Sequence, residues 1–201
     1  MTQKRIILIS GKARSGKDTV RYFLKRYLYE AKGIKQNKIK TIRFADTLKN
    51  GLAKMLNTDR KTLDRYKEEK KPYKNIDIRK ALQDVGSQLR DQNSDIFAFN
   101  AIEDVAKIKE DKIIFIPDLR YPNEVEVFHH SKYKDEYYVI KITRPEIDEE
   151  SKISKVYQHH SETSMDSIKP DIEIVNDGTL EELEKKVKDI ADDIFGGIDN
   201  G

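Results

Sequence analysis

The chain has 201 residues, with 39 Lys and Arg against 36 Asp and Glu, and it contains no cysteine. This length suits one domain, or one domain with a small insertion. The net charge of +3 is too close to balance to indicate nucleic-acid binding through bulk charge, and disulfides, catalytic thiols and Cys-ligated zinc are excluded. The apolar run at residues 6–9 is too short for a signal sequence or a membrane span. We therefore expect a folded cytoplasmic protein without membrane or nucleic-acid partners.

Runs rich in Ile and Val predict five strands, at residues 6–9, 39–44, 113–116, 137–142 and 172–175. Most of these runs are too apolar for a strand with one wetted face, which favours a parallel sheet covered on both sides. Helical spacing of apolar residues occurs between them, at residues 19–29, 48–56 and 81–89. Strands that alternate with helices predict a three-layer α/β fold in a single domain.

Roughly 65 residues separate the second and third predicted strands, far more than one crossover helix needs. We predict a helical insertion at about 46–108. Its charged middle, 59–75, is either a solvated helix and loop or a segment that contacts a ligand. The polar stretch at about 146–170 is a candidate lid.

The C-terminal segment begins with a predicted capping box, Thr179 with Glu182. It continues as an amphipathic helix whose apolar face comprises Leu180, Leu183, Val187, Ile190 and Ile194.

The segment "SGKARSGKDT", residues 10–19, lies between the first predicted strand and the first predicted helix. Gly11, Gly16 and Lys17 have the spacing of a phosphate-binding loop. Glycine lets consecutive amides turn inward around phosphate oxygens, and the helix N-terminus adds a positive end. We predict that the loop binds ATP through Gly11, Lys12, Ala13, Arg14, Ser15, Gly16, Lys17, Asp18 and Thr19.

Asp18 stands where a phosphate loop usually has Ser or Thr. A carboxylate is also a hard oxygen ligand, and Thr19 supplies a hydroxyl one residue later, so both are predicted magnesium ligands. The alternative is that Asp18 is an ordinary first-turn residue favoured by the helix dipole.

Four further segments accompany the loop: "RFADTLK" from Arg43, "RKALQDVGSQLR" from Arg79, "PDLRYPNEVE" from Pro117 and "HHSE" from His159. Together, and in this order, they resemble the phage-type deoxynucleoside monophosphate kinases, a P-loop family, over most of the chain. The resemblance implies a five-stranded parallel sheet with helices on both faces, a helical acceptor-binding region and a lid. It also implies magnesium-dependent transfer of a phosphoryl group from ATP to a deoxynucleoside monophosphate, with small-molecule nucleotides as partners. A homodimer is compatible with it.

Arginines and an amide on one predicted helix suit the acceptor nucleotide. Arg79, Gln83 and Arg90 recur with Ser87 at spacings of three and four, and a guanidinium suits a phosphate while an amide suits a base edge. A plain solvated face is the alternative.

The residues after the predicted strands are further candidates, because open parallel sheets bind ligands at the carboxyl ends of their strands. Asp118 is a candidate for holding metal-bound water or accepting a proton, and Arg120 for contacting the acceptor phosphate. The alternative is that both are ordinary turn residues, with Asp118 capping the next helix. Asp46 is predicted on the acceptor side too, with a helix N-cap as its alternative role. Glu162 matches the "HHSE" motif of the resembled family.

Arg14 and Arg144 are predicted to neutralise charge during phosphoryl transfer, together with Lys17 and Asp18 as catalytic residues. No arginine follows Arg144, so the lid offers only Lys152, Lys155 and Lys169 as cations. The turn after the last predicted strand, which contains Asn176, either lines the adenine pocket or serves only to cap the helix that follows.

Two other functions remain open at this point. One is a P-loop kinase for another small phosphorylated acceptor, of the phosphomevalonate or dephospho-coenzyme A type. The other is a nucleotide-regulated binding protein, against which the near-neutral charge and the lack of an NKxD segment count.

Overall fold

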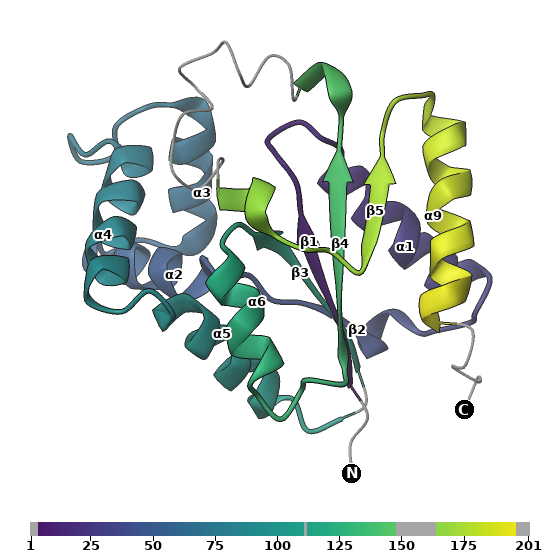
Figure 1. Ribbon diagram of the computed structural model, residues 1–201. Coiled ribbons are helices and arrows are strands. Elements are labelled where there is room, and N and C mark those ends of the chain that lie inside the picture. The colour runs from purple at the N-terminus through teal and green to yellow at the C-terminus, as the bar shows by residue number, and fades with distance from the viewer. Residues whose placement is uncertain (1–3, 111, 148–163, 196–201) are drawn as a thin grey trace.

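The computed structural model describes residues 4–110, 112–147 and 164–195. Its strands are β1 (Lys4–Ser10), β2 (Ile39–Thr41), β3 (Lys112–Leu119), β4 (Tyr137–Thr143) and β5 (Ile172–Val175). They form one sheet in the order β2-β3-β1-β4-β5, and every pair is parallel (Figure 1). The expected α/β fold, a five-stranded parallel sheet with helices on both faces, is confirmed.

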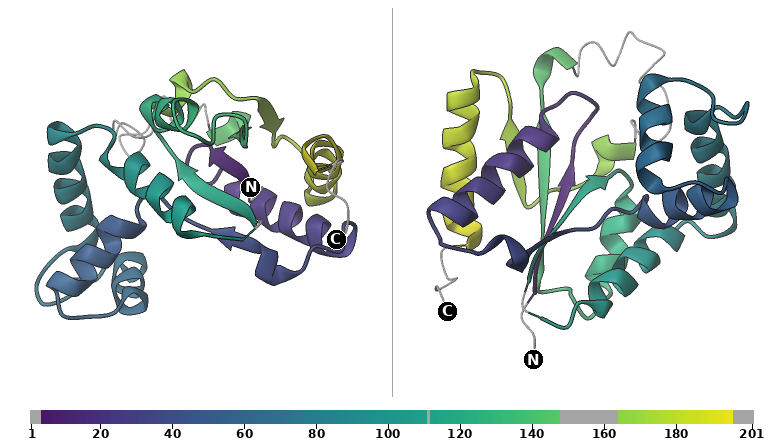
Figure 2. Two further views of the ribbon diagram at one scale, coloured as in Figure 1. Left: turned by 90° about the horizontal axis from the view of Figure 1, so that it is seen from below. Right: turned by 180° about the vertical axis from the view of Figure 1, so that it is seen from behind.

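Two pairs of helices cover the two faces of the sheet. One face packs against α1 (Lys17–Glu30) and α9 (Leu180–Phe195), and the other against α5 (Ile96–Lys107) and α6 (Pro122–His129) (Figures 1 and 2). The short helices η1 (Gln36–Lys38) and η3 (Ser164–Ser167) precede β2 and β5.

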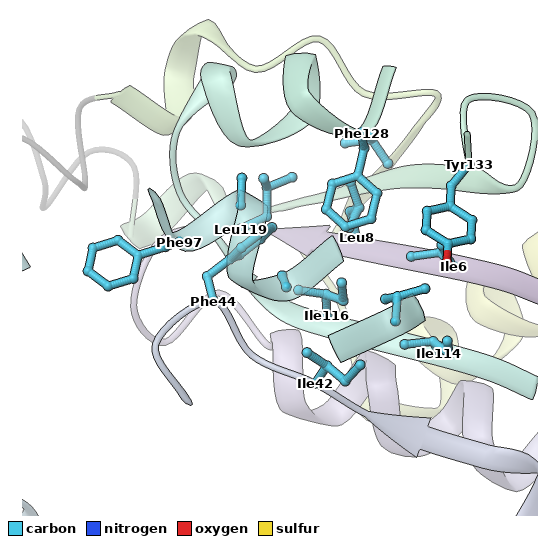
Figure 3. Close-up of a cluster of buried hydrophobic side chains, with 14 of the residues drawn as sticks. Ile6, Leu8, Ile42, Phe44, Phe97, Ile114, Ile116, Leu119, Phe128 and Tyr133 are labelled. Atoms are coloured by element: carbon cyan, nitrogen blue, oxygen red, sulfur yellow. The ribbon is translucent and has the colours of Figure 1, made fainter. Parts of the chain in front are cut away.

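The central strand β1 is buried on both faces. Ile6 and Leu8 belong to the hydrophobic cluster under α5 and α6, which Figure 3 shows, whereas Ile7 and Ile9 belong to the cluster under α1 and α9. Successive side chains of a strand point to opposite faces, so a strand covered on both sides must be apolar throughout. This explains the uninterrupted apolar run that predicted the strand.

Three helices form a separate lobe: α2 (Asp46–Met55), α3 (Arg60–Glu69) and α4 (Ile78–Gln92). The lobe lies beside the sheet at the end remote from α9 (Figures 1 and 2). It has a small core of its own, made of Leu52, Ala53, Leu63, Ile78 and Leu82. The following helix, α5, leaves the lobe and buries Phe97 and Ala98 in the cluster on the sheet.

The second strand is shorter than the predicted run at 39–44, because the Asp118 side chain accepts hydrogen bonds from the amides that follow it. Ile42 N still donates to Phe115 O at 3.0 Å. Further along, the amides of Phe44 and Ala45 donate to the Asp118 carboxylate instead of to β3 main-chain oxygens. The chain therefore turns away from the sheet and enters α2.

The predicted capping box of the last helix is present: Thr179 N donates to Glu182 Oε2, and Glu182 N donates to Thr179 Oγ1. The expectation that Leu180 joins the buried face is wrong, since this side chain is 63% exposed. No helix within the described ranges combines the length and the apolar character needed to cross a membrane.

Candidate functional site

The loop between β1 and α1 requires glycine at two positions. Gly11 has φ of +149° and Gly16 has φ of +103°, a region that other residues rarely adopt. A Cβ atom on Gly11 would lie 2.5 Å from Ile142 O, and one on Gly16 would lie 2.6 Å from Asn176 Nδ2. The loop thus turns sharply and packs closely against the ends of neighbouring strands.

Side-chain hydrogen bonds hold this loop in its curved form. Lys17 Nζ donates to Gly11 O and, at 2.7 Å, to Lys12 O. Asn176 Nδ2 donates to Ser15 O at 2.9 Å from the end of β5. The ammonium group therefore lies over the loop, at the N-terminus of α1, where the charge of a phosphate is favoured.

A hollow of about 440 Å³ opens beside the loop. Its lining combines predicted ATP-site residues with the start of α9: Arg14, Gly16, Lys17, Asp18, Thr19, Arg144, Asn176, Gly178, Leu180 and Leu183. This position explains the exposure of Leu180, which faces the hollow instead of the core. The polar end near Lys17 and the apolar end near Leu180 and Leu183 suit a molecule with phosphates at one end and a flat base at the other.

The oxygen donors at this hollow fit a magnesium ion that is bound mainly through a nucleotide. Asp18 is 86% exposed, and its Oδ1 lies 2.9 Å from Arg21 Nη2. Asp18 and Thr19 both line the hollow. Mg²⁺ keeps several waters and commonly takes only one or two protein ligands beside substrate phosphates. Within the described ranges no three His, Asp or Glu side chains gather into a metal site of their own.

Other predicted cations near the loop already have acidic neighbours. Lys12 Nζ lies 3.4 Å from Asp166 Oδ1, and Arg144 Nη2 lies 3.1 Å from Glu146 Oε2. Lys169 is exposed. Several residues of the predicted lid lie outside the described residues: Lys152, Lys155, His159, His160 and Glu162.

The two predicted carboxylates near the ends of β2 and β3 shape the start of the lobe. Asp118 accepts from Phe44 N at 3.0 Å and Ala45 N at 3.1 Å. Burial raises the pKa of Asp118, although these two amides oppose the rise. Asp46 accepts from Arg43 N at 2.9 Å and lies 3.1 Å from Arg60 Nη2. Both carboxylates thus fix the turn from β2 into α2.

Arg90 is held differently from Arg79 and Gln83, the other candidates on α4. Arg79 and Gln83 are exposed. The Arg90 guanidinium lies 4.4 Å from the ring centroids of both Phe97 and Tyr121. The expected common face of these residues therefore splits into exposed residues and one enclosed arginine.

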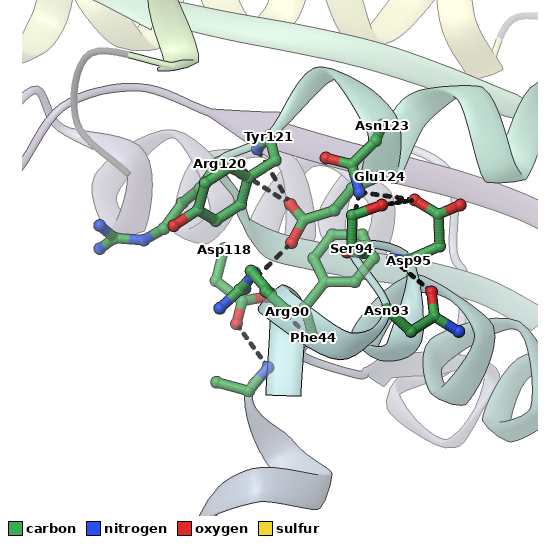
Figure 4. Close-up of polar contacts among 11 residues, drawn as sticks. Phe44, Arg90, Asn93, Ser94, Asp95, Asp118, Arg120, Tyr121, Asn123 and Glu124 are labelled. Atoms are coloured by element: carbon green, nitrogen blue, oxygen red, sulfur yellow. Dashed lines mark hydrogen bonds and ion pairs between the residues drawn. The ribbon is translucent and has the colours of Figure 1, made fainter. Parts of the chain in front are cut away.

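Glu124, at the start of α6, contacts the enclosed arginine (Figure 4). Glu124 Oε1 lies 3.5 Å from Arg90 Nη2, and the Glu124 side chain is only 2% exposed. Burial raises the pKa of Glu124 to about 7, against the lowering effects of Arg90 and of the amides of Arg120 and Tyr121.

Cations from several elements gather between the lobe and the end of β3. Lys67 of α3 lies within electrostatic range of Lys49, Arg79 and Arg120. Burial lowers the pKa of Lys67, and Lys49 and Arg79 lower it further. Such crowding of like charges is unfavourable unless an anion balances them.

Asp64 is an acidic residue within electrostatic range of Lys67. It binds Lys49 at 2.7 Å and Arg60 at 2.8 Å. Burial alone would raise the pKa of Asp64, but these two bonds outweigh it and lower the pKa. Asp64 thus pairs with Lys49 of the cluster and with Arg60 outside it, and it also raises the pKa of Lys67.

Sequence reasoning missed Lys49, Lys67, Glu124 and the pocket role of Leu180. One signal for Lys67 was present: it follows the buried Leu63 by four residues, so it lies on the inward face of α3. Glu124 gave no such signal, because its capping box has Tyr121 at the N-cap instead of the usual Ser or Thr.

Comparisons with known proteins place the chain among kinases. The family model for phosphomevalonate kinase matches residues 9–135. No curated protein sequence matches the chain.

The chain is also similar to solved structures of other proteins. The APS kinase of Mycobacterium tuberculosis in complex with AMPPNP and APS has 16% identity and a TM-score of 0.46, covering 94% of this chain and 98% of that one. A sugar kinase from Janibacter sp. HTCC2649 has 14% identity and a TM-score of 0.41, covering 98% of this chain and 99% of that one.

The family match bears on the predicted kinase class. The coarser expectation, a nucleotide-binding P-loop kinase, is confirmed; the narrower one, a phage-type deoxynucleoside monophosphate kinase, stays a prediction. Because the matched model spans more than half of the sequence, this chain belongs to the phosphomevalonate kinase family of P-loop kinases.

Proposed function

We propose that the protein transfers the γ-phosphoryl group of ATP to the phosphate group of a small phosphorylated acceptor. The observation that carries this proposal is the phosphate loop, where Lys17 lies over the main chain at the start of α1 beside a hollow of about 440 Å³. The acceptor side is the cation cluster, which comprises Lys67 and the three cations within its electrostatic range, Lys49, Arg79 and Arg120. Arg120 follows β3, and β3 pairs with β1 through Leu119 and Ser10, directly before the phosphate loop. The cluster and the loop therefore flank the same edge of the sheet.

The reaction needs little covalent chemistry from the protein. An oxygen of the acceptor phosphate attacks the γ-phosphorus of ATP, the bond from that phosphorus to the β–γ bridging oxygen breaks, and ADP leaves. The dianionic acceptor carries no proton on the attacking oxygen, so no general base is required. Positioning and charge stabilisation then account for catalysis.

Each half of the site has its own role in this proposal. Lys17 and the loop amides bind the β- and γ-phosphates of ATP, and the base of ATP lies against Leu180 and Leu183. Arg14 and Arg144, which line the same hollow, balance charge on the moving phosphoryl group.

Asp18 and Thr19 are the residues that would hold Mg²⁺, which neutralises charge on the phosphates when bound. The acceptor phosphate binds at the cation cluster, and Gln83 is the candidate contact for the remainder of the acceptor.

Two acceptors are supported by different observations. The order of the segments from Arg43, Arg79 and Pro117 favours a deoxynucleoside monophosphate. The family match over residues 9–135 favours phosphomevalonate, whose carboxylate would give the cluster a second anion to bind.

A coupled assay of ADP release, run with the four deoxynucleoside monophosphates, phosphomevalonate and dephospho-coenzyme A, tests the proposal. We expect turnover of at least one phosphate monoester and a loss of at least about 10²-fold in Lys17→Ala, which removes a charge-assisted contact to the transferred group. Arg79→Ala should instead raise the KM for the acceptor and leave the KM for ATP within about twofold. Turnover of none of these acceptors by folded protein that binds ATP would reject the proposed reaction.

A further inference from the structure

Glu124 divides its two carboxylate oxygens between two different partners. Oε1 faces Arg90 Nη2 at 3.5 Å. Oε2 accepts from Arg120 N at 2.9 Å and Tyr121 N at 3.1 Å. One buried side chain thus connects α4 in the lobe to the segment that follows β3 on the sheet.

The surroundings of Arg90 are built to hold a guanidinium in one place. Phe97 and Tyr121 lie on it from two sides, and stacking on aromatic rings stabilises a cation. Gly86, one turn earlier on α4, lies close to the guanidinium, since a Cβ there would be in van der Waals contact with Arg90 Nη1 at 3.6 Å. The rings fix the plane of the guanidinium, and Glu124 is the charged group that fixes its direction within that plane.

The main-chain contacts of Glu124 act on a second arginine. Arg120 belongs to the cation cluster, and its amide is bound to Glu124 while its side chain extends away from the carboxylate (Figure 4). The main chain at Arg120 is thereby held without use of its guanidinium.

We propose that Glu124 is a positioning residue, which fixes the guanidinium of Arg90 and the backbone of Arg120 for binding the acceptor phosphate. This inference rests on the proposed function, because it assumes that these arginines bind the acceptor. Glu124 itself is 2% exposed and does not contact substrate.

Because the two oxygens of Glu124 have different partners, Glu124→Gln should change the contact with Arg90 and keep the contacts with the two amides. A glutamine can keep its single oxygen on the two amides and preserve the capping box, but it then presents an NH₂ group to Arg90. The variant removes a buried charge, so it should fold. Glu182→Gln is the matched control. Glu182 has the same capping-box role in α9, where it accepts a hydrogen bond from Thr179 N at 2.8 Å. It makes no ion pair within the described part of the chain.

Steady-state kinetics with the acceptor that shows turnover in the panel above measures the effect. We expect Glu124→Gln to raise the acceptor KM about tenfold, the loss of roughly one charge-assisted hydrogen bond, with kcat and the KM for ATP within about twofold. Glu182→Gln should leave the acceptor KM unchanged. An acceptor KM of Glu124→Gln equal to that of the wild type would overturn the inference while leaving the proposed function intact.

A double-mutant cycle with Arg90→Lys shows whether Glu124 acts through Arg90. If it does, Glu124→Gln adds less than about twofold to the acceptor KM of Arg90→Lys. A full tenfold effect on that background would show that Glu124 acts by another route and would overturn the inference.

Side-chain ¹⁵N NMR tests the link without any turnover. A fixed guanidinium gives resolved Nη signals, which for Arg90 should be present in the wild type and in Glu182→Gln and should collapse in Glu124→Gln. Their persistence in Glu124→Gln would overturn the inference even if no acceptor in the panel were phosphorylated.

Discussion

At the scale of single residues, Glu124 shows how a buried acid makes stability depend on pH. Burial raises its pKa from 4.5 to about 7 in the folded chain, so between these values the folded state binds the proton more tightly than the unfolded state. The folded state is therefore favoured by this group below pH 4.5, and the advantage is lost as the pH rises to about 7. This pKa shift corresponds to a decrease of about 3 kcal/mol in the free energy of unfolding across that pH range.

Urea unfolding of the wild type and of Glu124→Gln from pH 4.5 to pH 8 measures this contribution. We expect the free energy of unfolding of the variant to exceed that of the wild type increasingly as the pH rises, by up to about 3 kcal/mol near pH 8. Groups that do not interact with Glu124 titrate equally in both proteins and cancel in the difference. A difference that is independent of pH would mean that Glu124 is charged throughout this range.

Residues differ in how far the sequence alone could predict their roles. Gly11 and Gly16 were predictable because a phosphate loop needs their backbone geometry, and that need is local. Lys67 and Glu124 were not, because their importance arises from neighbours that are distant in sequence. Arg79 and Arg120 approach Lys67 from two other elements, and Arg90 lies 34 positions before Glu124.

At the scale of elements, two glycines in neighbouring helices are expected to respond oppositely to the same substitution. Gly51 is exposed in α2, and a Cβ there would meet no atom within 4 Å. Gly86 is buried in α4, and a Cβ there would lie 3.2 Å from Leu48 Cδ2. Alanine improves helix propensity at both positions, but at Gly86 the gain is offset by crowding of Leu48.

Thermal unfolding of Gly51→Ala and Gly86→Ala compares these two effects. Gly51→Ala should gain up to about 1 kcal/mol, or roughly 2–4 °C in Tm for a chain of this size. Gly86→Ala should show no gain or a lower Tm, because its methyl group crowds Leu48. Equal stabilisation by both substitutions would mean that α4 shifts freely to accept the extra methyl group.

Elements were predicted best where one local pattern decides them. The apolar run at residues 172–175 forms β5 as predicted, and the capping box of Thr179 and Glu182 lies at the start of α9. The end of β2 was not predictable, because Asp118, more than seventy residues later, takes the amides that would have extended the strand. The position of Leu180 could not be inferred either, since an apolar residue at a pocket and one in a core follow the same helical period.

At the scale of the whole molecule, the sheet and the lobe differ in how firmly they are held. The sheet is buried between two large clusters of side chains, whereas the lobe of α2, α3 and α4 has a core of only a few residues. Within the described residues, the links between the two parts include Leu48, which packs against both cores, Asp118, which binds the entry to α2, and Arg90, which contacts Glu124 and two aromatic rings. The lobe should therefore open locally without unfolding of the sheet.

Native-state hydrogen exchange tests this difference and connects it to the site. Amides of α3 should exchange through an opening that costs less free energy than that of β1, by on the order of 2 kcal/mol.

ADP contacts only the loop and the start of α9 in the proposed site, so it should slow exchange in α1 and leave α3 nearly unchanged. An acceptor phosphate bound by Lys67, Arg79 and Arg120 would connect the lobe to the sheet, and it should slow exchange in α3 and α4. Protection of α3 by ADP alone, with no further effect of the acceptor, would place the acceptor phosphate away from the cation cluster.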